Sequence, residues 1–327
     1  MNINNFIKNI FTIKSETDFN SLALKLFHYQ YKNNPIYSQY LNLNKIDTNN
    51  IIHYTQIPFL PIELFRTQKI TSTNRNVDFF FKSSGTTGET PSKHYISDLN
   101  IYKKSIISCF NLFFQEPSEL VFLCLTPSPK EAPNSSLVFM CQELINTSKN
   151  NYSGFYLQKD MALIKAIIEC QNKKQNFIII GLSFEILQFA EKHKININNN
   201  IVIETGGTKK GNKRIIREHL HKRLMNAFKT KQIFSEYGMA ELLSQSYYTT
   251  HKYFKSPPWK KILIRDKTNP FNIIPKQRRG CINIIDLANI YSCGFIATND
   301  LGYLIKDGFN IIGRNQNSTE RGCNLMV

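Results

Sequence analysis

Hydrophobic residues follow helical and strand-like spacings in turn along much of this chain. Near the start, mostly apolar residues recur every three or four positions behind Ser15 and Thr17, which predicts an amphipathic helix. The residues of its inward face are Phe19, Leu22, Ala23, Leu26, Phe27 and Gln30. Residues 57–65 contain Pro58 and Pro61, which exclude a regular helix interior. We therefore predict an extended, aromatic-rich segment there.

The central part of the chain alternates short apolar runs with helical patterns. Residues 97–100 offer an N-cap for a helix whose apolar face includes Tyr102, Ile106 and Phe110. We predict strands at residues 120–125, 177–180 and 201–204, and helices at residues 161–170, 184–193 and 213–228. This alternation predicts an α/β fold with layered helices and largely parallel sheet.

Length and cysteine content narrow the class of protein. The 327 residues suffice for a large core and two or three subdomains. No stretch reaches the ~18 apolar residues of a membrane span, and the first residues lack the order of a secretion signal. We therefore expect a cytoplasmic protein. The seven cysteines are scattered without a Cys-x-x-Cys pair, which argues against a disulfide framework and a zinc site.

The chain is strongly basic, with 41 Lys and Arg against 24 Asp and Glu and a net charge of +17. Such a charge is compatible with nucleic-acid binding. The chain is also rich in Asn and Ile, as an A/T-rich coding sequence would make it, and its lysines are spread along its length. Background composition is the better explanation. A nucleic-acid-binding protein remains the alternative of a different class, and steep salt dependence of binding without ATP turnover would favour it.

Residues 81–94 contain the most distinctive polar run of the sequence. Its glycines, hydroxyl residues and lysine are Ser83, Ser84, Gly85, Thr86, Thr87, Gly88 and Lys93. Such a run can place backbone N–H groups, hydroxyls and one cation around a phosphate. It is not a Walker A loop, because no Gly-Lys-Ser/Thr follows at the required spacing. By composition alone, a solvated turn fits it as well as a nucleotide phosphate loop.

Three further polar patches follow apolar runs. Residues 204–208 come after a predicted strand and before a basic helix, where parallel sheets bind ligands. In residues 237–241, Glu241 fits either a metal ligand or an acid at a helix start. Asp300 is an isolated carboxylate between apolar runs, and Arg314 follows it.

In this order, the four patches resemble the adenylate-forming superfamily, which activates carboxylic acids with ATP. Residues 83–88 are similar to its phosphate loop, and residues 237–241 resemble its aromatic-Gly-x-Thr-Glu motif. Residues 298–300 resemble its Thr-Gly-Asp motif. A narrower resemblance, from Pro58 to the end, is to the acyl-protein synthetases of bacterial bioluminescence. These are the fatty-acid-activating subunits of a fatty acid reductase complex.

The resemblance implies a domain arrangement and two cofactors. Residues 1–312 would form the large N-terminal, AMP-binding domain, and residues 313–327 a vestigial C-terminal segment with Arg314 and Cys323. The chain stops four residues after Cys323. We therefore expect most of the superfamily's small C-terminal domain, with its catalytic lysine, to be missing, which counts against an ordinary coenzyme A ligase. The expected cofactors are ATP and Mg²⁺.

The resemblance also assigns roles to residues. The phosphate loop and Lys93 would offset phosphate charge, and Glu241 would hold Mg²⁺. His94 would touch the acid or the phosphates, although a structural histidine is the alternative. The nucleotide-binding residues would be Gly206 and Gly207 at an adenine-lining turn, Tyr237 and Gly238 near adenine, Asp300 at the ribose and Arg314 at ribose or phosphate.

Acyl transfer is the second reaction that the resemblance implies. Cys323 would accept the acyl group as a thioester, with neighbouring Arg321 favouring the thiolate. A bystander cysteine is the alternative. A long-chain fatty acid would be the substrate and a reductase-like protein the final acceptor. Alternatively, another acid, such as an aromatic one, would pass to coenzyme A or to an amine or hydroxyl acceptor in a lipid or glycan pathway.

Two positions depart from the superfamily's motifs. Asn299 replaces the middle glycine of Thr-Gly-Asp, and Ala240 replaces the threonine before Glu241. The second change removes a hydroxyl from the neighbourhood expected for the α-phosphate.

Overall fold

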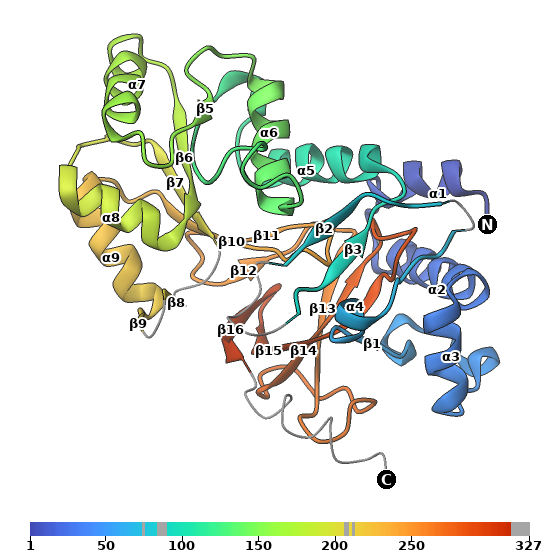
Figure 1. The fold of residues 1–327 in the computed structure, drawn as a ribbon. Coiled ribbons are helices and arrows are strands. Elements are labelled where there is room, and N and C mark those ends of the chain that lie inside the picture. The colour runs from blue at the N-terminus through green and yellow to red at the C-terminus, as the bar shows by residue number, and fades with distance from the viewer. Residues whose placement is uncertain (74–75, 84–89, 206–208, 211–212, 315–327) are drawn as a thin grey trace. The chain divides into compact units, whose positions relative to one another are not determined.

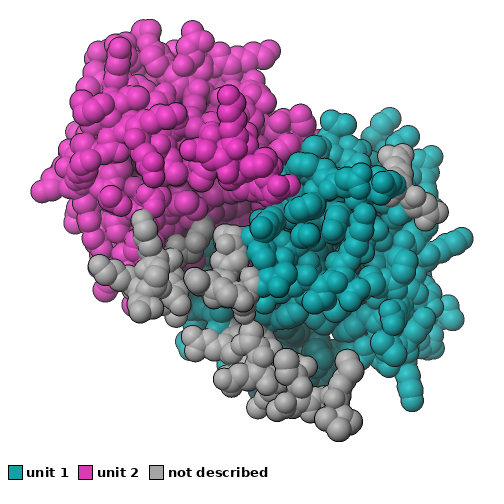
Figure 2. Space-filling view, viewed as in Figure 1, with its two compact units in different colours: residues 1–102, 240–244, 253–327 teal, residues 103–239, 245–252 magenta. Residues whose placement is uncertain are grey.

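The computed structural model describes residues 1–73, 76–83, 90–205, 209–210 and 213–314 of the chain. Two compact units share these residues, as Figure 2 shows in teal and magenta. Unit 1 comprises residues 1–102, 240–244 and 253–327. Unit 2 comprises residues 103–239 and 245–252.

Unit 1 begins with helices and continues with strands (Figure 1). Its helices are α1 (Ile3–Ile10), α2 (Glu16–Asn33), α3 (Pro35–Leu43), η1 (Thr48–Asn50), η2 (Tyr54–Gln56) and α4 (Leu64–Thr67). Its strands are β1 (Leu60–Pro61), β2 (Phe80–Lys82), β3 (Lys93–Tyr95), β12 (Phe254–Lys255), β13 (Lys260–Arg265), β14 (Gly280–Asp286), β15 (Phe295–Ile305) and β16 (Gly308–Arg314). Helix α5 (Leu99–Phe113) runs across the boundary into unit 2.

The larger sheet of unit 1 is mostly antiparallel. Neighbouring strands follow the order β13-β14-β15-β16-β12, and β1 adds to β15 in parallel. Strands β2 and β3 form a separate antiparallel pair. Helix α2 starts with a capping box, in which the Ser15 hydroxyl accepts from the Asp18 backbone N–H and the Asp18 carboxylate accepts from the Ser15 N–H. The predicted inward face of this helix is buried throughout, which confirms the N-terminal helix.

Unit 2 is built from strands and helices in alternation. Its strands are β4 (Val121–Leu125), β5 (Gly154–Phe155), β6 (Phe177–Leu182), β7 (Ile201–Thr205), β8 (Lys209–Lys210), β9 (Lys213–Arg214), β10 (Ile233–Tyr237) and β11 (Ser246–Tyr248). Its helices are η3 (Pro117–Glu119), α6 (Ser136–Ser148), α7 (Asp160–Asn172), α8 (Ser183–His193) and α9 (Arg217–Phe228). The strand order is β11-β10-β7-β6-β4-β5, parallel except between β10 and β11.

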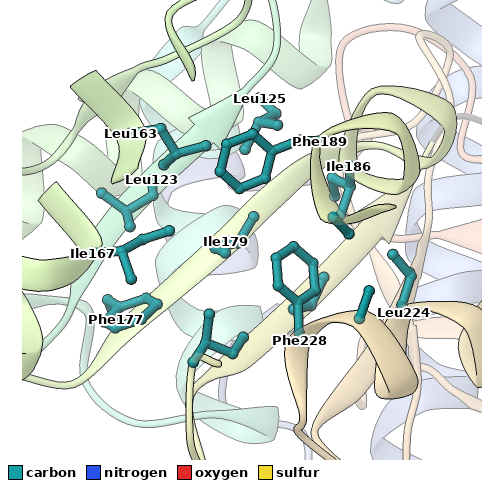
Figure 3. Close-up of a cluster of buried hydrophobic side chains, with 14 of the residues drawn as sticks. Leu123, Leu125, Leu163, Ile167, Phe177, Ile179, Ile186, Phe189, Leu224 and Phe228 are labelled. Carbon is teal, nitrogen blue, oxygen red and sulfur yellow. The ribbon is translucent and has the colours of Figure 1, made fainter. Parts of the chain in front are cut away.

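The core of unit 2 lies between this sheet and helices α7, α8 and α9 (Figure 3). Leu123, Phe177 and Ile179 from the strands pack with Ile167 and Phe228 from the helices. Strand β4 is buried at all five positions, as its apolar sequence predicts. The parallel sheet carries its strand ends, and the polar residues that follow them, to one edge.

Three expectations need correction. The basic helix begins at Arg217 and not at Lys213, because residues 213–214 form β9. The segment of residues 57–65 is extended only as far as β1, and α4 starts at Leu64, beyond both prolines. The expected largely parallel sheet is confirmed in unit 2, whereas unit 1 is mostly antiparallel.

Within the described ranges, no helix has both the length and the apolar character needed to cross a bilayer.

Candidate active site

Strands β2 and β3 flank the expected phosphate loop in unit 1. Residues 84–89, which include Ser84, Gly85, Thr86, Thr87 and Gly88, lie outside the described residues. At the base of the loop, the Ser92 N–H donates to the Ser83 hydroxyl at 3.0 Å and the Ser83 N–H donates to the Ser92 carbonyl at 3.2 Å. The exposed Lys93 holds its Nζ 5.1 Å from the Phe80 ring centroid. The hairpin thus fixes the two ends of the loop close together.

Glu241 is attached directly to this hairpin. Its carboxylate is buried and accepts a hydrogen bond of 2.5 Å from the Ser92 hydroxyl. Burial raises the pKa of Glu241, and the Ser92 hydroxyl and the charges of Arg314 and Arg66 oppose that rise. Burial is the largest of these effects, so the pKa of Glu241 lies above its usual value, although the nearby cations favour the ionised carboxylate that a metal ligand requires.

His94 lies on β3, the strand that follows Ser92, and its ring contacts the backbone of the Ala240–Glu241 turn. Its ring is completely buried, with Nδ1 2.8 Å from the Ala240 carbonyl and Nε2 2.9 Å from Asn289 Oδ1. The Asn289 amide nitrogen in turn donates to the carbonyls of Glu241 and Cys293, at 2.9 Å each. This fixes the Asn289 oxygen toward the ring. His94 and Asn289 thus clamp two successive carbonyls of the Ala240–Glu241 turn.

These contacts give His94 a structural role. Both of its partners are oxygen acceptors, and a neutral imidazole has only one N–H to donate. Burial lowers the pKa of His94 to about 4, against the effect of the two acceptors. The direct contact with acid or phosphates that the resemblance implied remains a prediction. Ala240 contributes its backbone carbonyl here, so the missing threonine hydroxyl does not weaken this clamp.

Asp300 and Arg314 meet on neighbouring strands of the unit 1 sheet. They are register partners on β15 and β16, and Arg314 Nε lies 3.3 Å from Asp300 Oδ1. Asp300 is largely buried, while the Arg314 side chain is 77% exposed. The Asp300 N–H donates to the Thr298 hydroxyl at 3.1 Å, and that hydroxyl donates to the Ile282 carbonyl at 2.8 Å. The pair therefore presents a fixed carboxylate beside a solvent-accessible guanidinium.

Unit 2 holds a buried charged network at the end of β7. The carboxylate of Glu204 accepts hydrogen bonds from the hydroxyls of Ser183 and Ser235, and His221 Nε2 lies 3.3 Å from it. Burial acts to raise the pKa of Glu204, but the hydrogen bonds from His221, Ser183 and Ser235 outweigh it and hold the pKa below its usual value. Because His221 Nε2 faces both Ser235, at 3.0 Å, and Glu204, this is not a serine–histidine–acid relay.

The same strand end carries the residues nearest to the expected adenine turn. Gly206 and Gly207 lie outside the described residues. The hydroxyl of Thr205, just before them, donates to the Glu236 carboxylate, which also occupies the space that a Cβ at Gly238 would need. Tyr237 lies between these two residues at the end of β10 and is buried. Glu236 thus ties the end of β7 to the Tyr237–Gly238 segment.

The structure groups the predicted residues within each unit. In unit 1, Ser83, Lys93, His94 and Glu241 belong to one hydrogen-bonded region, and Asp300 pairs with Arg314. In unit 2, Tyr237 and Gly238 lie beside Glu236. The acyl-acceptor candidate Cys323 lies outside the described residues, as does Arg321.

Sequence reasoning missed several residues that hold this site. Ser92 lies within the polar run of residues 81–94, and its hydroxyl two residues before His94 is a signal that the sequence does contain. Asn289 and Glu236 belong to no motif and become visible only through their contacts. No group of three or more His, Cys, Asp or Glu that would hold a metal ion occurs among the described residues.

The family model described as "Acyl-protein synthetase, LuxE" matches residues 12–327. The chain belongs to the LuxE acyl-protein synthetase family. The predicted resemblance, which runs from Pro58 to the end of the chain, is therefore confirmed. A comparison with curated proteins gave no significant match.

Solved structures similar to this LuxE family member are adenylate-forming enzymes. An open conformation of 2-hydroxyisobutyryl-CoA ligase with 2-HIB-AMP and CoA has a TM-score of 0.70 and 11% identity, covering 92% of this chain and 71% of the ligase. ATP-bound MatB from Rhodopseudomonas palustris has a TM-score of 0.54 and 14% identity, covering 74% of this chain and 50% of MatB. The luciferase-like enzyme of the mealworm Zophobas morio has a TM-score of 0.52 and 15% identity, covering 74% of this chain and 59% of that enzyme.

These likenesses concern the fold. They confirm the large domain of an adenylate-forming enzyme, as the sequence predicted. The chain spans about half the length of MatB.

Proposed function

We propose that this protein activates a carboxylic acid with ATP and then carries the acyl group on Cys323. The observation that supports this most directly is the LuxE family match, which runs through residue 327 and so includes Cys323. A neighbour of the same fold was solved with an acyl-adenylate, 2-HIB-AMP. Sequence motifs and fold therefore favour the same first product.

The proposed first step forms a mixed anhydride. A carboxylate oxygen of the acid attacks the α-phosphorus of ATP, the bond from that phosphorus to the bridging oxygen breaks, and pyrophosphate leaves. Charge increases on the phosphates during the step, and fixed donors and cations lower its cost. Lys93 and the phosphate loop would provide them in unit 1. Asp300 would accept hydrogen bonds from the ribose hydroxyls, with Arg314 at ribose or phosphate.

Glu241 is the residue we assign to Mg²⁺. Mg²⁺ in such sites takes one or two carboxylates together with substrate phosphates, and seldom an all-protein cage. A single buried carboxylate held by Ser92 fits that donor set. The ion would neutralise phosphate charge. Since the described residues contain no cluster of three ligands, we expect little Mg²⁺ binding without nucleotide.

The proposed second step moves the acyl group to sulfur. The Cys323 thiol first loses its proton to solvent. The thiolate then attacks the acyl carbon, the bond from that carbon to the AMP oxygen breaks, and AMP leaves. The six other cysteines are buried. Burial raises the pKa of Cys170 to about 11 and that of Cys293 to about 12, so these thiols are poor nucleophiles. This supports Cys323 as the acceptor.

The substrate and the final acceptor follow from family membership alone. We propose a long-chain fatty acid as the substrate and a reductase-like partner protein as the acceptor of the thioester. Transfer to coenzyme A is the main competing outcome, because the ligase with the same fold was solved with CoA.

The test is incubation with ATP, Mg²⁺ and radiolabelled acids of several lengths, followed by denaturing gels with and without hydroxylamine. Pyrophosphate release is measured in parallel. Cys323→Ser and Glu241→Gln are the variants, and Cys170→Ser is the matched control for loss of a buried thiol. We expect hydroxylamine-labile label on the unmodified protein and on the control, and none on either variant.

The outcomes separate the two steps. Label that persists on Cys323→Ser as a thioester would contradict the cysteine assignment. Acid-dependent pyrophosphate release without protein label would mean that the acid passes to another acceptor, which added coenzyme A would reveal. Neither signal with any acid would contradict the proposed adenylation.

A further inference from the structure

The Thr298–Asp300 segment of β15 lies between two ladders of the unit 1 sheet, as far as the described residues extend. Strand β14 pairs with residues 295–297 and 301–302 of β15, so β1 and β16 share the opposite edge. On that edge, β1 pairs with Ile296 and Ala297, and β16 pairs from Asp300 onward. Among the described residues, which end at Arg314 on β16, neither ladder pairs with Thr298 or Asn299. These two positions form the gap between the described parts of the two ladders.

A side-chain contact bridges this gap. The register of β1 sets Leu60 opposite Ile296 and Pro61 opposite Ala297, so Glu63 is next in line for Asn299. The backbone turns away at Glu63, which adopts helical angles at the start of α4. The last backbone hydrogen bond runs from the Ile62 N–H to the Ala297 carbonyl, at 3.0 Å. Beyond it, the Asn299 side-chain amide donates to the Glu63 carboxylate.

The guanidinium of Arg265 supports the same segment by a hydrogen bond to its backbone. Arg265 donates to the Thr298 carbonyl at 2.8 Å and to Asn283 Oδ1 at 2.8 Å. Burial lowers the pKa of this guanidinium, and the negative charge of Glu63 is among the effects that oppose the shift. The hydrogen bond of Glu63 goes to Asn299.

The contact between Glu63 and Asn299 also affects the orientation of Asp300, because side chains alternate between the two faces along a strand. Successive side chains point to opposite faces, so fixing Asn299 toward Glu63 directs Thr298 and Asp300 to the other face. The burial of Thr298 and Asp300, with Asn299 more exposed between them, agrees with this. A glycine at residue 299, as in the superfamily motif, would have no side chain with which to make this contact.

We propose that Glu63 and Asn299 form a positioning pair that holds the Asp300 carboxylate in the orientation needed to bind the ribose of ATP. The inference rests on the proposed function, in which Asp300 receives the ribose hydroxyls. It explains why this chain carries an amide where the related motif has glycine. It also assigns a role to residues 58–65, because Glu63, where this segment enters α4, accepts the hydrogen bond from Asn299.

The experiment compares ATP with 2′-deoxy-ATP and 3′-deoxy-ATP in acid-dependent pyrophosphate release. The variants are Asn299→Gly, Glu63→Ala, their combination, and Glu63→Gln, in which an amide oxygen still accepts from Asn299. Asn310→Gly is the matched control, because it also removes one side-chain hydrogen bond, to Tyr303 at 3.2 Å, from the same hairpin. Thermal unfolding of each variant verifies the fold.

We expect the unmodified protein to prefer ATP over at least one deoxynucleotide through a lower KM. Asn299→Gly and Glu63→Ala should each reduce this preference by roughly tenfold, the loss expected when one hydrogen bond to a charged group is no longer held in place. The double variant should lose no more than either single variant, since both break one contact. Glu63→Gln and Asn310→Gly should keep the preference.

Three results would overturn the inference, and they separate its failure from the failure of the proposed function. Full ATP preference in Asn299→Gly, or no preference in the unmodified active protein, would refute the positioning pair while the proposed function stands. Absence of acid-dependent pyrophosphate release in the unmodified protein would refute the proposed function and this inference together.

Discussion

Acidification should destabilise the fold through His94. This ring is completely buried, and burial lowers its pKa from 6.5 to about 4 in spite of the two oxygen acceptors around it. In the unfolded chain, the ring would take up a proton near its ordinary value. Between these two values the unfolded state binds more protons than the folded state. The free energy of unfolding must therefore decrease as the pH falls through this window.

The magnitude follows from the size of the shift. A displacement from 6.5 to about 4 corresponds to about 3 kcal/mol, at about 1.4 kcal/mol for each pH unit. No reduction for solvent screening applies, because the side chain has no exposed surface. The contribution is complete above the unfolded value, declines below about pH 6.5, and is lost near the folded value.

Urea unfolding between about pH 7.5 and about pH 4.5 measures this effect. His94→Asn retains an amide near the Nδ1 position and His94→Gln one near Nε2, so each preserves one of the two contacts without titrating. His219→Gln, at an exposed position on α9, is the control. The stability advantage of the unmodified protein over both His94 variants should shrink by about 2.5 kcal/mol across this range. The control should track the unmodified protein.

The opposite sign would refute the reasoning. An advantage that grows toward low pH would mean that the Ala240 carbonyl and the Asn289 oxygen outweigh burial and that the folded protein holds an imidazolium. An unchanged advantage would mean that the ring does not change its protonation on unfolding. Nitrogen NMR of the ring distinguishes these states at pH 7 independently of stability.

Two further predictions concern buried carboxylates. Glu204→Gln should lower the free energy of unfolding by about 3 kcal/mol. The substitution removes the buried negative charge that accepts hydrogen bonds from Ser183, Ser235 and His221. In contrast, Glu191→Gln at the exposed pair with Arg223 should change it by less than about 1 kcal/mol, and urea unfolding that gives equal effects would contradict this. Ser92→Ala removes a group that lowers the Glu241 pKa, so the acidic limb of pyrophosphate release should move to higher pH. Ser97→Ala, whose buried hydroxyl has no hydrogen-bond partner among the described residues, should leave the pH profile unchanged.

Local pattern predicted part of unit 2 correctly, but not helix α6 or strands β10 and β11. Strands β4, β6 and β7 and helices α7 and α8 lie where apolar runs and helical spacings indicated. These elements bury apolar faces that can be read directly from the chain, since burial and periodicity have the same cause. The start of α9 was misplaced because Lys213 and Arg214 pair with β8 as a short ladder, and pairing partners are not encoded in local spacing.

Unit 1 was harder to predict, for a physical reason. Its sheet brings β1, near residue 60, against β15, near residue 296, and no local pattern records such a pairing. The same holds for polar side chains. Glu63 and Asn299 are 236 positions apart in the sequence, and Ser92 and Glu241 are 149 apart.

The family, the order of the motifs and the chemical types available could be read from the sequence: a loop of small hydroxyl residues, a carboxylate at Glu241 and a second at Asp300. Their burial and the groups that hold them became known from the folded structure. It placed His94 and Asn289 on the carbonyls of the Ala240–Glu241 turn and Glu63 on Asn299. Motif residues are constrained by the chemistry of a ligand and so keep a recognisable spacing. Their supports are constrained only by geometry, which many residue types at distant positions can satisfy.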